Sequence, residues 1–208
     1  MALAFLLLLG AFVLGACGSS GATSGETAST AAGGSAAGDV KTYTDANYGY
    51  SFDYPDGWEV QEGDSAEVTA GGSAAGSVGV YDPDGAVADK TYIDLAQVSV
   101  YKLSVAIDSS MMPQIKTEVE AVLASLESQA ADMKTVESLS QTTVGGMTGY
   151  KATYSFSKSG APVTSTLYFL FSGSLEYQLT LQAADENWEA KKPAFATLVA
   201  SFKPGASE

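Results

Sequence analysis

The run Leu167-Tyr168-Phe169-Leu170-Phe171 constrains the fold of this chain more than any other feature, because it puts large apolar side chains at five consecutive positions. Successive side chains of a β-strand point to opposite faces of the sheet, so a strand of this composition must be buried on both faces. We therefore predict that residues 164–171 form a central strand of a sheet that is covered on each side.

The segment after Ser172-Gly173-Ser174 has a different pattern, since apolar and polar residues alternate strictly from 175 to 182. Such alternation predicts a strand with one face in the core and one face toward solvent. The residues expected to point inward are Leu175, Tyr177, Leu179 and Leu181, and those expected to point outward are Glu176, Gln178, Thr180 and Gln182.

Strand period also appears earlier, where Tyr50, Phe52 and Tyr54 alternate with polar residues before a turn at 55–57. Trp58 and Val60 open the next strand, and further strands are expected at 66–70, 78–81 and 92–103. The apolar phase of the last of these slips between residues 95 and 98, which indicates a bulge or a strand covered on both faces. A two-residue hairpin turn is expected at 145–146, followed by a strand that presents one shared face of Tyr150, Ala152, Tyr154 and Phe156.

Two helices are predicted from apolar residues that recur every three or four positions. The first spans 112–131, with Ser109 or Ser110 as its cap and Pro113 in its first turn. The second is capped by Asp185, and its apolar face is Trp188, Phe195, Leu198, Val199 and Phe202. The predicted fold class is therefore α+β, an antiparallel sheet flanked by helices.

The chain begins with an apolar run, residues 3–14, that is shorter than the roughly 20 residues a membrane span needs. It has the length of a signal segment and ends in Leu14-Gly15-Ala16-Cys17, which resembles the lipobox of bacterial lipoproteins. The resemblance implies that residues 1–16 are a signal peptide and that Cys17 carries the lipid that anchors the protein to the extracytoplasmic face of the cell membrane.

The absence of Lys or Arg before Leu3 departs from that pattern, and leaves the α-amine of Met1 or a start further upstream to supply the positive charge. The alternative is a secretory signal in which Cys17 is incidental. Residues 17–38 are almost all Gly, Ser, Ala and Thr, so we expect a flexible tether between the lipidated Cys17 and a globular domain at 39–208.

Composition excludes several functions. The formal net charge of −14 disfavours nucleic acid and anionic headgroups as partners. The chain contains no His and no Arg, so a Ser-His-Asp triad, a His-ligated zinc site and bidentate Arg clamps are impossible. Because Cys17 is the one cysteine and is expected to carry lipid, no thiol nucleophile remains. We predict no catalytic residues and no cofactor.

Three local patterns resemble functional motifs but have a simpler explanation. Ser99 to Lys102 and Ser155 to Lys158 have the Ser-x-x-Lys spacing, yet in a strand the two residues would face opposite ways. Asp82-Pro83-Asp84-Gly85 is a good turn sequence and lacks the further ligands of a calcium loop. An acidic stretch is expected to be a solvated surface, with a weak divalent-cation site as the alternative; it comprises Asp53, Asp56, Glu59, Glu62, Asp64 and Glu67.

The segment 50–58, Tyr-Ser-Phe-Asp-Tyr-Pro-Asp-Gly-Trp, is similar to the opening of PsbP-like domains. The closing stretch from Trp188 through Ala200-Ser201-Phe202 is similar to the last helix of that group. The resemblance covers roughly residues 43–203 and implies an α/β/α sandwich. It also implies binding to other macromolecules without shared catalytic residues, and no ligand-binding residue carries over from it.

These observations favour a non-enzymatic lipoprotein that binds a protein partner in the cell envelope. One alternative is a carrier or sensor of a lipid or other apolar small molecule, with its pocket between sheet and helix among the many tyrosines. A further alternative is an enzyme that uses carboxylates alone, as glycosidases do. The sequence identifies no metal site and no ligand-binding residue.

Overall fold

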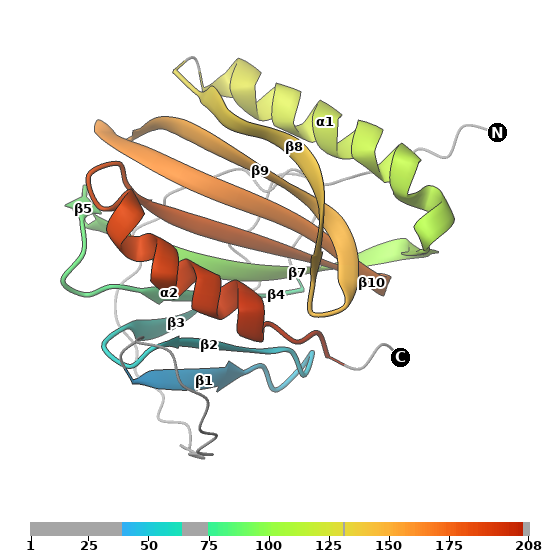
Figure 1. The fold of residues 1–208 in the computed structure, drawn as a ribbon, viewed down its shortest axis with the longest axis horizontal. Helices are drawn as coiled ribbons and strands as arrows, with labels where there is room; N and C mark the ends of the chain where they lie inside the picture. The colour runs from blue at the N-terminus through green and yellow to red at the C-terminus, as the bar shows by residue number, and fades with distance from the viewer. Residues whose placement is uncertain (1–38, 64–74, 131, 206–208) are drawn as a thin grey trace.

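A computed structural model describes residues 39–63, 75–130 and 132–205 of the chain (Figure 1). It contains ten strands, a short 3₁₀ helix and two α-helices. In chain order these are β1 Val40–Thr44, β2 Ser51–Pro55, β3 Glu59–Gly63, β4 Gly76–Tyr81, β5 Val87–Ala88, β6 Thr91–Tyr92, β7 Leu95–Ile107, η1 Ser109–Met111, α1 Met112–Gln129, β8 Lys134–Val144, β9 Met147–Lys158, β10 Ala161–Ala184 and α2 Trp188–Ser201.

The main sheet has six antiparallel strands in the order β3-β4-β7-β10-β9-β8. The pairs β1-β2 and β5-β6 form two small separate sheets. Together with the two helices, this arrangement confirms the predicted α+β class.

The long strand β10 folds back on itself at residues 172–174. Its first arm, 161–171, pairs with β9, and its second arm, 173–182, pairs with β7. The amide of Asp185 donates to the carbonyl of Pro162 at 3.0 Å, which places the two ends of β10 side by side. Gly173 has a φ of +58° in this reversal, a conformation that glycine adopts at little cost. Figure 1 shows the two arms running next to each other in lighter and darker orange.

The first arm of β10 is buried on both faces, as its sequence predicts. Every residue from Val163 to Phe171 is buried. Even-numbered Tyr168 and Leu170 belong to the core on the α2 side, whereas Leu167 and Phe169 belong to the core on the α1 side. The first arm of β10 therefore lies between the two hydrophobic cores and contributes side chains to both.

Each helix covers one face of the sheet. The amphipathic face of α1 buries Ile115 and Val119 against Tyr150 and Phe169 of β9 and β10. Helix α2 buries Phe195 and Leu198 against the opposite face, together with the strand β2. In Figure 1, α2 crosses in front of β7 and β10 with β1 and β2 beside it, and α1 lies along β8.

The layer that contains α2 also holds the opening segment of the domain. Tyr50, just before β2, and Phe52, within β2, stack on Phe202, which follows α2. Ser51 forms a bridge with Lys203, so the start and the end of the domain are hydrogen-bonded to each other. Strand β1 was not anticipated, because its residues are mostly exposed and carry no apolar alternation.

Several sequence predictions need correction. Glu176 and Gln182 do not point to solvent but are 2% and 0% exposed, and Leu175 is only half-buried. For β7 the sequence left two alternatives, a bulge between 95 and 98 or cover on both faces. The strand pairs continuously from Leu95 to Lys102 and is buried at four successive residues, 98–101, which supports the second alternative. The strand expected at 66–70 lies outside the described residues.

The helix caps also differ from the prediction. Asp108 caps η1 by accepting from the amide of Ser110, whereas neither Ser109 nor Ser110 caps α1 with its side chain. Pro113 does lie in the first turn of α1. Helix α2 begins after Asn187 rather than Asp185, since the Asp185 carboxylate instead accepts from the Thr164 hydroxyl at 2.7 Å. Over the described ranges, neither helix combines the length and apolar character that crossing a membrane requires.

Candidate functional site

The predicted lipid-attachment residue, Cys17, lies outside the described residues, as do the signal segment 1–16 and the tether 17–38. Anchoring through Cys17 therefore stays a prediction. The two Ser-x-x-Lys matches lie within β7 and β9, where residues three apart face opposite sides of the sheet, so neither forms a dyad.

The segment Asp82–Gly85 is a turn, as predicted. The amide of Gly85 donates to the carbonyl of Asp82 at 3.0 Å, and the amide of Asp84 donates to the Asp82 carboxylate at 3.0 Å. The other Asp82 oxygen is paired with Lys191 of α2. The turn therefore joins the edge of the domain to α2. Of the residues that the structure describes, no three carboxylates or other metal-ligating groups lie close enough together to hold an ion.

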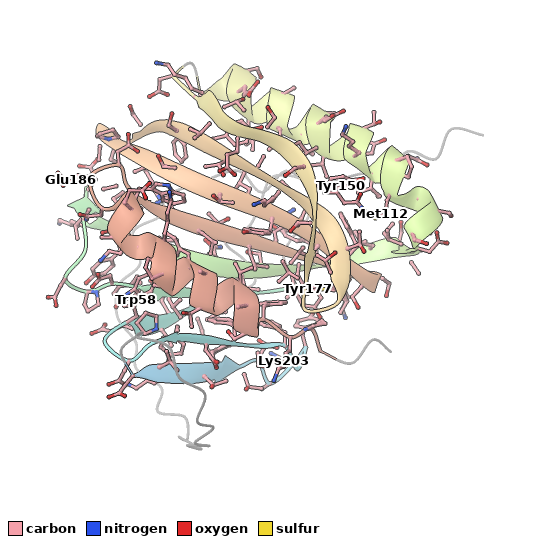
Figure 2. All side chains as sticks on the ribbon, in the orientation of Figure 1. Trp58, Met112, Tyr150, Tyr177, Glu186 and Lys203 are labelled. Atoms are coloured by element: carbon pink, nitrogen blue, oxygen red, sulfur yellow. The ribbon has the colours of Figure 1, made fainter. Side chains whose placement is uncertain are left out.

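The described residues include a small pocket beside the start of α1. It has a volume of about 170 Å³ and is lined by Ile107, Asp108, Ser109, Met112, Gly146, Met147, Thr148, Phe171 and Ser172. Met112, one of the lining residues, accepts a hydrogen bond of 2.7 Å at its carbonyl from the Tyr150 hydroxyl (Figure 2). Small-molecule sites usually occupy roughly 300–1,000 Å³, so this pocket gives the lipid-carrier hypothesis no support.

An acidic surface runs over β1, β2 and β3. Residues 39–63 contain six carboxylates and one lysine. Lys41 pairs with Asp56 at 2.9 Å, Thr42 donates to Asp53 at 2.6 Å, and Tyr43 donates to Glu62 at 3.3 Å. We call this the acidic β1–β3 surface and define it by Asp39, Asp45, Asp53, Asp56 and Glu62. Of the other members of the predicted acidic stretch, Glu59 accepts from the Tyr81 hydroxyl at 2.6 Å, and Asp64 and Glu67 lie outside the described residues.

The pKa of Tyr43 is affected by the carboxylates of this surface. Burial raises the pKa of its hydroxyl, and the nearby carboxylates of Asp45 and Glu62 raise that pKa further, because a phenolate would be repelled by both. The acidic β1–β3 surface is therefore a region of concentrated negative potential, which attracts cationic groups at short range.

A second surface lies on the face of the sheet opposite α2. Val98 and Val100 of β7 point to the α2 core, so Gln97, Ser99 and Tyr101 point to the other face. Their register partners lie beside them on that face. Gln97 is flanked by Gly79 and Thr180, Ser99 by Ser77 and Gln178, and Tyr101 lies next to Glu176.

The half-buried members of this second surface form a band that we call the polar strip. It comprises Ser77, Gln97, Gln178 and Thr180, with Gly79 between them and the stacked pair Tyr81 and Tyr92 at one end. The rings of this pair are 4.0 Å apart, and the Tyr81 hydroxyl donates to Glu59 at 2.6 Å.

The hydrogen bonds of the polar strip orient its two carboxamides. Gln97 Nε2 donates to the hydroxyls of Ser77 at 3.0 Å and Ser99 at 3.2 Å. Gln178 Nε2 donates to Glu176 Oε1 at 2.9 Å. Both amide nitrogens are thus engaged within the protein, and among the described residues neither carboxamide oxygen accepts a hydrogen bond.

Glu176 is the unusual group beneath the polar strip. Burial raises its pKa to about 7, and the hydrogen bond from Gln178 offsets that effect only in part. Burial, together with the charge of Glu176, raises the pKa of Tyr101 to about 12. A carboxyl group buried in this way keeps its proton at a higher pH than an exposed carboxyl group does.

Sequence reasoning missed this site because alternation shows which residues share a face, not whether that face is covered. The available signal was the row of Gln, Ser and Thr at every second position of two neighbouring strands. Such a row is more polar than a core face and less charged than an ordinary solvated face.

Comparison with known proteins identifies a family and several related folds. A family model described as PsbP-like protein matches residues 7–204. A search of curated proteins finds no match to the sequence.

Three solved structures illustrate the structural similarity. Cyanobacterial PsbP (CyanoP) from Synechocystis sp. PCC 6803 is 17% identical with a TM-score of 0.53, over 84% of this chain and 98% of that one. LpqN, involved in cell envelope biogenesis of Mycobacterium tuberculosis, is 14% identical with a TM-score of 0.53, over 80% of this chain and 92% of that one. The chain spans only 46% of a 17% identical structure from Bacteroides thetaiotaomicron, over 76% of its own length, with a TM-score of 0.48.

Proposed function

The chain belongs to the family of PsbP-like proteins, and we propose that it is a non-enzymatic lipoprotein that binds a protein partner in the cell envelope. In this proposal Cys17 carries the lipid, residues 17–38 are the tether, and the domain at 39–208 makes the contact. The acidic β1–β3 surface is the observation that carries the proposal, because it gives the domain a defined place for a cationic partner.

The proposed location is supported by the N-terminal sequence. The run Leu14-Gly15-Ala16-Cys17 has the form of a lipobox and follows an apolar segment of signal length. LpqN, which shares the fold, is involved in cell envelope biogenesis, and this agrees with the proposed location. A flexible tether raises the effective concentration of the domain near other proteins at the membrane.

The proposed partner presents Lys and Arg side chains. The acidic β1–β3 surface adjoins β1, the first strand after the tether, and its carboxylates are exposed or half-buried. Complementary charge raises the rate of association and suppresses wrong partners, and both effects weaken as salt screens the charges. The absence of His and Arg from the sequence supports a binding role over catalysis.

Crosslinking in intact cells followed by mass spectrometry tests the proposal. The informative variant combines Asp53→Asn, Asp56→Asn and Glu62→Gln, which keeps the shape and the hydrogen-bonding capacity of the surface. Its matched control, Glu118→Gln, Glu120→Gln and Glu127→Gln on α1, changes the net charge equally. We expect the first variant to lose a crosslinked protein that the wild type and the control retain.

Equal loss in both variants would mean that net charge, not this surface, governs the contact. A wild type that yields no crosslinked protein, and that instead co-purifies with lipid in native mass spectrometry, would overturn the proposal in favour of the carrier hypothesis.

A further inference from the structure

We propose that the outer edge of β1 takes up an extended, basic segment of the partner protein as a third strand of the β1–β2 sheet. This inference rests on the proposed function, because it names the kind of segment that meets the acidic β1–β3 surface and the way in which that segment is held. Its experiment separates the two, since strand addition and attraction by charge alone respond to different changes.

The β1–β2 sheet has one edge that is paired and one that is not. The β2 edge is closed by the end of α2 and the residue that follows it. Ser51 exchanges two main-chain hydrogen bonds of 2.9 Å with Lys203, and the amide of Asp53 donates to the Ser201 hydroxyl at 2.7 Å. No strand in the described part of the chain pairs with the β1 edge. In Figure 1, β1 lies at the lower margin of the fold, with β2 between it and α2.

The register of the sheet shows which main-chain groups point to the unpaired edge. Opposite residues of an antiparallel pair alternate between hydrogen-bonded and non-hydrogen-bonded pairs. The amide of Asp45 donates to the carbonyl of Tyr50 at 2.9 Å, and the amide of Asp56 donates to the carbonyl of Asp39 at 2.8 Å, so the odd-numbered residues of β1 bond to β2. The even-numbered residues therefore direct their N–H and C=O groups outward, as a template for another strand. They are Val40, Thr42 and Thr44.

The unpaired edge is accessible to solvent. Four of the five residues of β1 are exposed, and Val40 is 47% exposed. Edge strands are commonly protected by proline or by an outward lysine. The sequence of β1 contains no proline, and its one charged side chain, Lys41, is paired with Asp56 at 2.9 Å. The edge of β1 is therefore open to pairing with a partner.

Charge decides which kind of segment suits this edge. The hydroxyl of Thr42 donates to Asp53 at 2.6 Å on one face of the β1–β2 sheet, and that of Tyr43 donates to Glu62 at 3.3 Å on the other face. A strand laid against β1 would thus have a carboxylate near each of its two faces. Basic side chains on either face would be attracted and acidic ones repelled.

A second copy of this chain suits the edge less well. If β1 paired antiparallel with β1 of another copy about Thr42, Asp39 of one copy would lie opposite Asp45 of the other. Like charges directly opposite each other destabilise a sheet, and the formal net charge of −14 adds to the repulsion. The chain's own tether also lacks the required charge, since residues 17–38 contain no Lys and no Arg.

A proline at the centre of β1 tests the main chain of the edge. Thr42→Pro removes an outward N–H, keeps the main-chain bonds between β1 and β2, and leaves the charge of the surface unchanged. A residue before proline favours an extended conformation, which Lys41 already has within β1. Thr42→Ala is the matched control, because it loses the same side-chain bond to Asp53 and keeps the N–H.

The experiment measures the binding of two fluorescent peptides to the full chain, purified in detergent, by anisotropy at low salt. One peptide has four Lys-Thr repeats and favours a strand, whereas the other has four Lys-Pro repeats, with the same charge but without every second N–H. We expect the wild type and Thr42→Ala to bind the Lys-Thr peptide. Binding should be about tenfold weaker when Thr42→Pro replaces the wild type or the Lys-Pro peptide replaces the Lys-Thr peptide, since one or two lost hydrogen bonds correspond to about that factor.

Hydrogen exchange gives a second measurement on the wild type. The amides of Thr42 and Thr44 should exchange more slowly when the Lys-Thr peptide is bound, because an added strand would accept from them. In cells, Thr42→Pro should lose the crosslinked protein that Thr42→Ala retains.

Equal binding of the two peptides, without slower exchange at Thr42, would overturn this inference in favour of attraction by charge alone and would leave the proposed function in place. Failure of the Lys-Thr peptide to bind the wild type, or a crosslinked protein retained by a folded Thr42→Pro variant, would also overturn it. Thermal unfolding shows whether that variant is folded, and the peptide comparison and exchange rates on the wild type decide the matter if it is not. Peptide binding as expected, with no crosslinked protein from wild-type cells, would support strand addition at β1 and count against the proposed function.

Discussion

Asn187 and Asp94 are joined by a hydrogen bond of 2.7 Å, from the side-chain nitrogen of Asn187 to Oδ2 of Asp94, although 93 residues separate them in sequence. Asp94 is fully buried and also accepts from the amides of Ala86 at 3.1 Å and Ala184 at 2.8 Å. One carboxylate thus ties the segment before β7 to the junction between β10 and α2. Buried polar groups are tolerated when they are paired in this way.

Asp94→Ala is expected to destabilise the domain by about 3 kcal/mol or more, because it leaves three donors without their acceptor in the interior. Urea unfolding measures the change. Asp84→Ala, on the exposed turn nearby, serves as the control and should shift the free energy of unfolding by less than about 0.5 kcal/mol. Similar losses in the two variants would contradict the role assigned to Asp94.

Glu176 should make stability depend on pH. Burial raises its pKa from 4.5 to about 7, so between these values the folded state holds a proton that the unfolded state has released. Stability therefore falls as pH rises through this window, by up to about 3 kcal/mol. Glu176→Gln should flatten the profile between pH 4.5 and 7 and be more stable than the wild type above pH 7.

Urea unfolding at a series of pH values checks the Glu176 prediction. Glu120→Gln, on the exposed face of α1, should keep the wild-type profile. A Glu176→Gln profile that parallels the wild type over the whole range would show that folding does not raise the pKa of Glu176.

Phe195 and Trp188, the two large aromatic residues of α2, should contribute unequally to the free energy of unfolding. Phe195 is 4% exposed and packs edge-on against Trp58, whereas Trp188 is only half-buried. Sequence periodicity predicted Trp188 as the core residue that holds the helix to the sheet, and the structure gives that position to Phe195. Phe195→Ala should cost about 3–5 kcal/mol, and Trp188→Ala should cost less, since less of its surface is removed from water. Thermal unfolding ranks the pair, and the reverse order would restore Trp188 to the core.

Cys17→Ala should abolish the anchor. If Cys17 carries lipid, the variant is released to the medium or retained as an unprocessed precursor, because a single apolar segment of this length does not span the bilayer. Fractionation and intact-mass measurement distinguish these outcomes. Membrane-bound wild-type protein with an unmodified Cys17 would contradict the prediction.

A strand or helix could be predicted from the sequence where its pattern of apolar residues was compatible with only one structure. The unbroken apolar run at 167–171 required burial on two faces, and α1 follows a three-to-four spacing that begins at Met112 as predicted. The reversal after Phe171 also follows from its sequence, since Gly173 supplies the positive φ that the bend needs.

Long-range partners could not be predicted. Whether Glu176 is solvated depends on what covers its face, and that is set by strands far away in sequence. Asp185 is a second example. Its side chain could have capped α2, but the fold brings the Thr164 hydroxyl within reach, and the carboxylate accepts from that hydroxyl instead. The acidic β1–β3 surface could be anticipated from composition, whereas the polar strip required the register of three strands.

The bridge between Ser51 and Lys203 has a practical consequence for experiments in living cells. It brings Lys203, close to the end of the described residues, next to β2, and β2 in turn pairs with β1, the first strand of the domain. A fluorescent reporter fused after residue 205 would therefore stand on the α2 side, near the first strand of the domain.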